Sequence, residues 1–360
     1  MKLRKGTDIT DLLLEIKRAY YYKLLESRII AIFEKKPTIQ RLFMNLERTG
    51  YNKLDPIIPE INKITQKVIE NAGVLQEIPE KQLRDILKII QTVGKQFNDS
   101  LDTIELISLE YNNNSIQLIY SFNSTIVTET IPGDFSKLFN RIQYKLSNSE
   151  KLMRVTIVLL RYITVVGDSI GLQMALPAKC FDVLQKNLEI YTECFASPLN
   201  VNENTKYFCS RFPDTDRFFG SIGKFSEITL DPSISYELNP PFTEELINET
   251  LTKVLNSKST CVVILPCWDD MELVQKASKI ADYTYYLPAK IPRKLLIKAE
   301  TITGPFYYEN GLAIVSNFRT MRMNKDSIVF VFLKNKQSKI KWNQCKNDFF
   351  NNFRISSANH

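Results

Sequence analysis

The segment Cys261-Val262-Val263-Ile264-Leu265-Pro266 is an uninterrupted apolar run. A run of this length predicts a strand buried on both faces, as in a parallel sheet that is covered by helices. Apolar residues recur at helix spacing on both sides of it, over residues 246–255 and 271–280. The second half of the chain is therefore predicted to be an α/β domain.

The rest of this half continues the alternation of helix and strand. We predict a helix at 177–187, strands at 189–195 and 283–287, and a closing hairpin of 312–316 with 328–333. Such a sheet binds ligands at the carboxyl ends of its strands, where Ser197 and Asn239 both fall.

The first half is predicted to be mostly helical, with a small antiparallel meander at about 103–131, where the apolar period switches to two. The predicted helices are 7–37, 38–48, 57–71, 79–96, 135–145 and 150–166, the last of them apolar enough to be buried between domains. A chain of 360 residues can hold two cores. We place the domains at 1–150 and 151–335, followed by a C-terminal tail at 336–360.

Composition and charge limit the class of protein. Lys and Arg number 47 against 40 acidic residues, and this formal charge of +7 favours a polyanionic partner without proving one. The longest apolar run, 155–166, is interrupted by Arg161 and is shorter than a membrane span of about 18 residues, so no membrane partner is expected. Asp8 and Asp11 follow the basic start, so we expect no secretory signal and an intracellular protein.

Six cysteines lie without any C-x-x-C pair, and the single histidine is His360. This pattern argues against a zinc site and for a reducing compartment, and no metal is expected. It also disfavours hydrolases that use imidazole as a base. Methyl transfer from a sulfonium to an amine, which needs no strong base, fits better.

The tetrapeptide Asn239-Pro240-Pro241-Phe242 is predicted to end a strand and lead into a helix. Proline has no amide hydrogen, so the two prolines stiffen the turn and leave carbonyl oxygens as acceptors. Asn239 adds an amide oxygen and Phe242 a flat apolar face. These groups complement an exocyclic adenine amine, but taken alone a proline-rich strand-to-helix loop explains them equally well.

Ser197 and Asn239 are 42 residues apart (239 minus 197), and a segment dense in aromatics and turn formers, 212–221, lies between them. Long loops in compact domains are usually functional. Its carboxylates suit a ribose, and Gly220 allows close backbone approach to a ligand. Asp-capped turns with aromatic anchors are the equal alternative.

A second basic and aromatic segment, Lys17-Arg18-Ala19-Tyr20-Tyr21-Tyr22-Lys23, lies in the first predicted helix. It combines the side chains that stack on bases and hold phosphates. The same pattern arises in a helix with tyrosines toward the core and lysines toward solvent, which is the favoured interpretation.

Three blocks together resemble one family in order and spacing: Glu193–Asn200, Phe212–Asp216 with Phe219–Ser221, and Asn239–Phe242 with Glu244–Leu246. The family is that of the phosphorylated CTD-interacting factor, the cap-specific adenosine-N6 methyltransferases. The resemblance implies a mostly helical domain ahead of a Rossmann-like class I methyltransferase domain. It also implies S-adenosylmethionine as the donor and, as the partner and substrate, mRNA whose first adenosine adjoins a 7-methylguanosine cap.

The resemblance also assigns site residues. It implies that the amine is held by Asn239, Pro240, Pro241 and Phe242. The residues implied to border the donor are Phe195, Ala196, Ser197, Pro198, Asn200, Asp214, Asp216, Gly220 and Ser221.

The chain departs from the family pattern in two places. We expect no WW module ahead of the helical region, so docking on the phosphorylated polymerase tail is not implied. The segment after Pro288, with Lys290, Arg293, Lys294 and Lys298, also differs, which puts cap dependence in question. Two alternatives stay open: an adenine-N6 methyltransferase that acts on internal RNA or DNA, and a non-catalytic relative that binds RNA or the cap.

Overall fold

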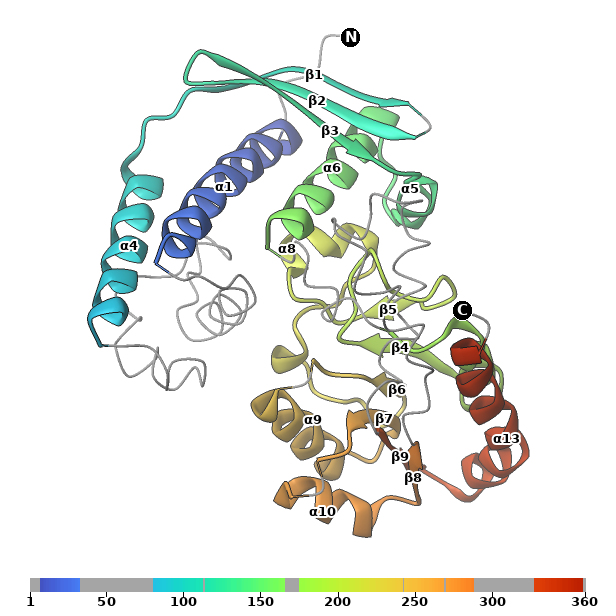
Figure 1. Ribbon diagram of the computed structural model, residues 1–360. Coiled ribbons are helices and arrows are strands. Elements are labelled where there is room, and N and C mark those ends of the chain that lie inside the picture. Colours follow the sequence, from blue (N-terminus) through green and yellow to red (C-terminus); the bar gives the residue numbers. More distant parts are fainter. Residues whose placement is uncertain are drawn as a thin grey trace. The chain divides into compact units, whose positions relative to one another are not determined.

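The computed structural model describes residues 7–32, 80–112, 114–165, 175–241, 243–268, 270–287 and 327–358. The chain divides into two compact units (Figure 1). Unit 1 comprises residues 1–131 and 146–169, and unit 2 comprises residues 132–145 and 170–360. These boundaries differ from the expected division at residue 150, because residues 132–145 belong to unit 2 and residues 151–169 to unit 1. The helices expected at 38–48 and 57–71 lie outside the described residues.

Unit 1 contains helices α1 (Thr7–Ile30), α4 (Glu80–Asp99) and α6 (Asn148–Val165) and strands β1 (Ile104–Asn112), β2 (Ser115–Phe122) and β3 (Thr125–Pro132). The strands form one sheet in the order β1-β2-β3, which lies over one end of α1 and α6 (Figure 1). β1 pairs with β2 in antiparallel register from Ile104↔Phe122 to Asn112↔Ser115. The predicted antiparallel meander is confirmed for its first two strands.

A buried ion pair joins α1 to α6. Arg161 Nε and Nη2 each donate to one carboxylate oxygen of Glu15 at 2.7 Å, and the two side chains are 0% and 1% exposed. Both charges have lost their hydration, so each depends on the other. This contact explains why α6 belongs to unit 1 and is buried against α1.

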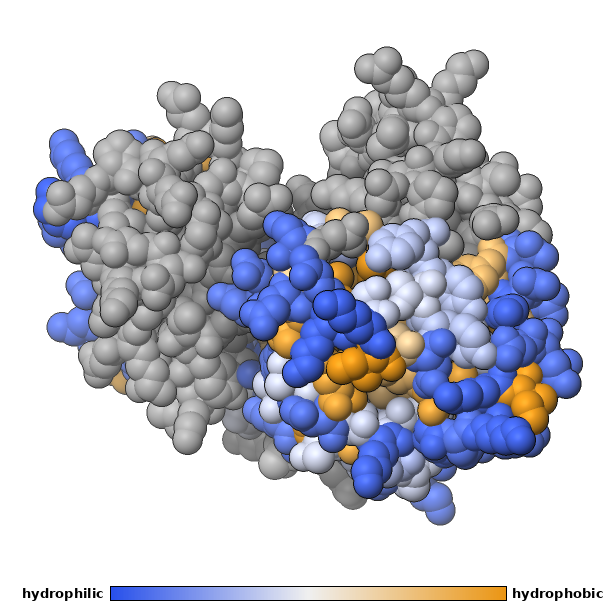
Figure 2. Space-filling view, turned by 90° about the horizontal axis from the view of Figure 1, so that it is seen from below, coloured by the Kyte–Doolittle hydropathy of each residue, from blue (hydrophilic) through white to orange (hydrophobic). Residues whose placement is uncertain are grey.

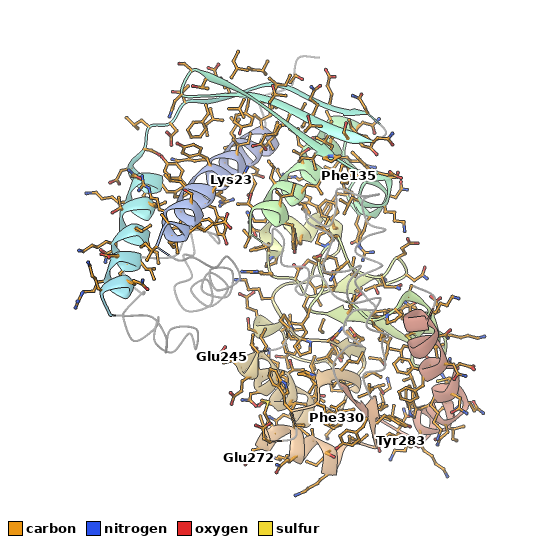
Figure 3. The ribbon with its side chains drawn as sticks, viewed as in Figure 1. Lys23, Phe135, Glu245, Glu272, Tyr283 and Phe330 are labelled. Atoms are coloured by element: carbon orange, nitrogen blue, oxygen red, sulfur yellow. The ribbon has the colours of Figure 1, made fainter. Side chains whose placement is uncertain are left out.

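The basic and aromatic segment of α1 is neutralised within unit 1. Tyr21 and Tyr22 are buried, whereas the exposed Tyr20 stacks on Phe122 with ring centroids 4.4 Å apart. Figure 3 labels Lys23, the last cation of this segment, on α1. The cations pair as follows: Lys17 with Asp102, Arg18 with Glu15 and Lys23 with Glu129. The structure supports a helix with a tyrosine face on the core.

Within the described residues, unit 2 is built on a sheet of six strands, which confirms the predicted α/β class. Its strands, in spatial order, are β5 (Tyr207–Phe208), β4 (Ile190–Cys194), β6 (Ser235–Leu238), β7 (Thr260–Pro266), β9 (Ser327–Phe332) and β8 (Tyr283–Leu287). β5, β4, β6 and β7 run parallel, and β9 is antiparallel to both of its neighbours, β7 and β8. The segment 312–316, expected to pair with β9, lies outside the described residues.

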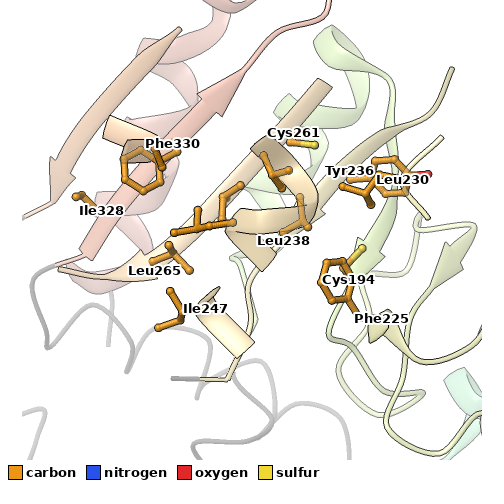
Figure 4. Close-up of a cluster of buried hydrophobic side chains, with 14 of the residues drawn as sticks. Cys194, Phe225, Leu230, Tyr236, Leu238, Ile247, Cys261, Leu265, Ile328 and Phe330 are labelled. Carbon is orange, nitrogen blue, oxygen red and sulfur yellow. The ribbon is translucent and has the colours of Figure 1, made fainter. Parts of the chain in front are cut away.

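Helices cover both faces of this sheet. Buried residues of α9 (Glu244–Asn256) and α10 (Glu272–Ile280) pack on the face that carries Val263 and Leu265 (Figure 4). Those of α7 (Ala178–Leu188) and α13 (Lys336–Ala358) pack on the face that carries Val262 and Ile264. The uninterrupted apolar run in β7 is thus explained, since its side chains enter two cores.

The residues expected to be a C-terminal tail form α13 instead. Trp342 and Phe349 are fully buried, and the indole Nε1 of Trp342 donates to the Tyr285 hydroxyl at 3.1 Å. Trp342, Cys345 and Phe349 recur at helix spacing, so they form the apolar stripe of a core helix.

Two surface properties bear on possible partners. No helix within the described ranges has both the length and the apolar composition that a membrane crossing requires. The described part of the face in Figure 2 is mostly hydrophilic, with its hydrophobic residues in separate groups. Exposed apolar residues scattered in this way are normal on protein surfaces and mark no binding site by themselves.

Candidate active site at the carboxyl ends of β4 and β6

The order of the strands reverses between β4 and β6. The chain passes from β4 to its neighbour β5 and then crosses to β6 on the other side of β4, from which it continues to β7. In open α/β sheets, ligands bind outside the carboxyl ends of the strands at such a switch point. Cys194 and Leu238 are Cα partners in this pair of parallel strands. Phe195 and Asn239 therefore leave neighbouring strands at the same level, about 4.8 Å apart in the hydrogen-bonding direction.

Asn239 and the two prolines connect β6 to the start of α9. Asn239 and Pro240 are buried and Pro241 is partly exposed. The Pro241 carbonyl accepts the Thr243 N–H at 2.8 Å, and the Thr243 hydroxyl caps α9 by accepting the Leu246 N–H at 3.4 Å. The carbonyl of Pro241 thus already accepts a hydrogen bond within the turn, whereas the sequence predicts a turn that leaves its carbonyl oxygens as acceptors for a ligand. Phe242 lies outside the described residues.

Phe195, the first residue after β4, has an unusual backbone conformation. Its φ is +67°, a region that bulky side chains rarely adopt and that costs roughly 1–3 kcal/mol. Two contacts hold it there: the ring lies 4.5 Å from that of Phe225, and the next residue, Ala196, donates its N–H to the Cys209 carbonyl at 3.0 Å. Backbone strain of this kind is concentrated at functional sites.

The residues after Phe195 form a tight turn that is closed by one side chain. Asn200 Oδ1 accepts both the N–H and the hydroxyl of Ser197, at 2.7 and 3.0 Å. The backbone completes the turn, since the Ser197 carbonyl accepts the Asn200 N–H at 3.2 Å. Ala196, Ser197, Pro198 and Asn200 are all buried. They shape the backbone at the strand end, and Phe195 is the member of the block that is partly exposed.

The block Phe212–Ser221 follows β5, the neighbour of β4 on the side away from β6. It consists of α8 (Pro213–Asp216) and the 3-10 helix η3 (Arg217–Phe219). Asp216 is fully buried, and its carboxylate accepts the Thr215 hydroxyl at 2.9 Å, whereas Asp214 is exposed. Asp214 and Asp216 were predicted to have the same role, but their environments differ, and only Asp214 is accessible to a ligand.

Gly220 and Ser221 lie apart from the other site residues. On the edge of β5 that faces away from β4, the Phe208 N–H donates to the Gly220 carbonyl and the Phe208 carbonyl accepts the Ile222 N–H. β5 and β4 therefore separate Gly220 and Ser221 from Asn239. Gly220 has a φ of +103°, and a Cβ on it would come within 2.7 Å of Gln143 Nε2 and 3.1 Å of the Lys206 carbonyl. The turn itself thus requires this glycine.

Replacing Gly220 with alanine is expected to destabilise the protein by roughly 1–3 kcal/mol, because the left-handed φ and the Lys206 carbonyl both oppose a side chain. Gly223 is the matched control: its φ is +131°, but a Cβ there would meet only Ile228, at 3.8 Å. The midpoints of urea unfolding should fall for both variants and further for Gly220→Ala. Equal losses would show that crowding by the Lys206 carbonyl is not significant.

Sequence reasoning gave no role to a pair of buried carboxylates behind the strand ends. Glu193 and Glu237 are Cα partners on β4 and β6, and they are 3% and 0% exposed. The Asn202 N–H donates to Glu193 at 3.0 Å. Burial lowers the pKa of Arg141, and the charge of Glu193 acts in the opposite direction, so the two side chains interact electrostatically. The available signal was a glutamate near the end of each of two strands that are mostly buried.

The buried thiols of Cys194 and Cys261, within the strands of the sheet, are unsuited to act as nucleophiles. Cys194 lies 3.9 Å from Cys209, sulfur to sulfur, and both are buried. Burial and the neighbouring Cys209 hold the pKa of the Cys194 thiol well above its usual value, and burial raises the pKa of Cys261 to about 12. A thiolate is the reactive form, so these cysteines are structural. Among the described residues, no group of three His, Cys, Asp or Glu is placed to hold a metal ion.

Comparison with known proteins bears on the same region. Residues 135–290 match the model of a family described as "Phosphorylated CTD interacting factor 1 WW domain". The chain is 37% identical over 148 residues to the mRNA (2'-O-methyladenosine-N(6)-)-methyltransferase of Mus musculus, covering 37% of this chain and 20% of that relative. It is 32% identical over 176 residues to the Homo sapiens protein of the same name, covering 45% and 24%. These matches support the family that the sequence resembles.

Two consequences follow from the matches. The expectation that the chain has no WW module was wrong, because the matching family model is described as a WW domain. The absence of a WW module was the reason for not inferring binding to the polymerase tail, and this reason no longer applies. The matched residues run from α5 (Ser136–Arg141) to just beyond β8 and so include β4, β6 and both strand ends of the candidate site. The chain spans only about a fifth to a quarter of the length of these relatives.

Proposed function

We propose that this chain is an RNA methyltransferase that uses S-adenosylmethionine to methylate the N6 amine of adenosine, at the cap-adjacent (2'-O-methyl)adenosine of mRNA. The observation that carries the proposal is the pairing of Cys194 with Leu238, because it joins the block 195–200 to Asn239 and Pro240 at a switch point. The names of the two relatives support the same chemistry. Unit 2 would then be a Rossmann-like methyltransferase domain.

The residues at the ends of β4 and β5 fit the donor. S-adenosylmethionine, when bound, supplies an electrophilic methyl group on a sulfonium. The partly exposed Phe195 would offer an aromatic edge, and the buried turn that Ser197 and Asn200 close would offer backbone groups of fixed direction. Asp214 is exposed and lies after β5, so its carboxylate would accept the hydroxyls of a ribose. The buried Asp216 would brace the same turn.

The residues after β6 fit the amine. Asn239 Oδ1 and the Pro240 carbonyl would each accept one of its two hydrogens, and Phe242 is proposed to stack on the base. With both hydrogens held, the nitrogen lone pair is directed toward the end of β4, where the donor residues lie. Because a thioether leaves without charge, the enzyme needs no strong base and acts mainly by positioning.

The proposal is tested by transfer of labelled methyl from S-adenosylmethionine to matched substrates. The substrates are capped RNA that begins with adenosine or 2'-O-methyladenosine, the same RNA without a cap, and DNA of the same sequence. We expect labelling of the capped RNAs alone, with the label recovered as N6-methyladenosine.

Each other result contradicts a defined part of the proposal. Equal labelling of capped and uncapped RNA would remove the cap requirement, and labelling of DNA would show that the ribose is not read. If no substrate is labelled although the protein binds RNA, the chain is a binding protein.

A further inference from the structure

A surface beside β5 combines exposed cations with aromatic rings from three segments of unit 2. We call it the β5-edge surface, and its members are Tyr144, Lys145, Lys206, Tyr207, Arg217 and Phe218. Tyr144 and Tyr207 are 50% and 40% exposed, and the three cations are exposed as well. The surface is adjacent to Gly220 and Ser221, which were expected at the donor site.

Hydrogen bonds to backbone carbonyls hold the three segments together. The Gln143 N–H donates to the Phe218 carbonyl at 3.2 Å, and its Nε2 donates to the Lys206 carbonyl at 3.3 Å. Beneath them, the Arg141 guanidinium donates to the carbonyls of Phe219, Asn202 and Thr205 at 3.0, 3.3 and 2.8 Å. The backbone that carries the rings and cations is therefore fixed before any ligand binds, which lowers the entropic cost of binding.

Two of the cations lie over aromatic rings of the same surface. Lys206 Nζ lies 5.1 Å from the centre of the Tyr207 ring, and Arg217 Cζ lies 5.1 Å from that of Phe218. The Tyr144 ring adjoins Phe218, with centroids 5.3 Å apart. The six residues carry three positive charges and no carboxylate. This differs from the segment 17–23 of α1, in which all three cations form ion pairs.

We infer that the β5-edge surface binds the single-stranded RNA that continues from the adenosine held at Asn239. Exposed rings that stack on bases, next to cations that contact phosphates, are what sequence-independent single-strand binding requires. β5 lies two strand spacings from β6, about 10 Å, and Tyr207 is level with Tyr236, about 10 Å before Asn239 along the strand direction, so an RNA chain of a few nucleotides reaches both places. The inference rests on the proposed function, since that function supplies the RNA.

The test compares Lys206→Ala/Arg217→Ala and Tyr144→Ala with a matched control, Lys179→Ala/Lys186→Ala, which removes two exposed lysines from α7. Binding of a fluorescent capped RNA of about 20 nucleotides is measured by anisotropy, without donor, over a range of salt. Each phosphate contact contributes a slope of about 0.7 in log affinity against log salt. The first variant should therefore bind roughly 10- to 30-fold more weakly near 0.1 M salt, with a slope shallower by about 1.4. Tyr144→Ala should lose about tenfold through stacking.

Methyl transfer to a capped dinucleotide separates this inference from the proposed function. In this dinucleotide the 7-methylguanosine cap is joined to adenosine and no nucleotide follows it, so nothing extends to the β5-edge surface and all variants should methylate it at the wild-type rate. The inference is wrong if the Lys206/Arg217 variant binds the long RNA as the wild-type protein does, or if the α7 control loses as much affinity. If the wild-type protein methylates nothing but the binding losses appear, the surface stands and the proposed reaction fails.

Discussion

Asn239→Ala is expected to lower kcat for capped RNA by roughly 10²- to 10³-fold while leaving the affinity for S-adenosylmethionine unchanged. The size of the effect is that of removing one preorganised hydrogen-bonding group from a transition state. Asn239 is buried and lies between β6 and the capped start of α9, so its amide is held in place before substrate binds. An acceptor placed in advance acts on the oriented amine during transfer more than on the resting complex, so kcat should fall further than KM rises.

The control for this variant is Asn256→Ala, an exposed asparagine at the other end of α9, which should retain full activity. Donor affinity is measured by calorimetry and turnover by labelled methyl transfer. A loss of donor affinity as large as the loss of turnover would assign Asn239 to the donor site instead. Full turnover of Asn239→Ala would refute its role as an acceptor.

The strands that local patterning defines could be predicted from the sequence. Val262–Leu265 lies in two cores, so its apolar run is continuous and allows one interpretation. β5 is a different case, because two residues carry no period and Tyr207–Phe208 is a strand only through its pairing with β4. The C-terminal helix was missed although Trp342, Cys345 and Phe349 share a stripe, since the polar residues between them hide it.

The candidate site divides in the same way. The residue types of Asn239 and Phe195 indicated a site. They are neighbours because Cys194 pairs with Leu238, and this pairing joins strands 44 residues apart (238 minus 194), for which the local sequence holds no signal. Asp214 and Asp216 are chemically alike, and only tertiary packing buries one and exposes the other. From the sequence, Gly220 was explained by the close approach of a ligand. In the structure, the groups that leave no room for a side chain at this position are Gln143 and the Lys206 carbonyl.

Arg161→Met is expected to destabilise unit 1 by about 3–5 kcal/mol, because it leaves the carboxylate of Glu15 buried without its bidentate partner. Glu15 and Arg161 are 146 residues apart in sequence, so the pair closes unit 1 by joining its first helix to its last. Arg18 also contacts Glu15, through one bond of 3.2 Å, and cannot replace two bonds of 2.7 Å. Hydrogen exchange of the α1 and α6 amides under increasing urea measures the free energy of unfolding of unit 1. A single global unfolding transition would not separate unit 1 from unit 2.

Lys23→Met is the matched control for that variant, since it breaks an ion pair of the same unit whose side chains, Lys23 and Glu129, are 55% and 27% exposed. Water solvates the Glu129 that remains, so the loss should stay within about 1 kcal/mol. The contrast between the two variants distinguishes burial from charge pairing as the cause. If Arg161→Met costs no more than Lys23→Met, water must reach Glu15 in the variant, and the α1–α6 contact depends on its apolar residues alone.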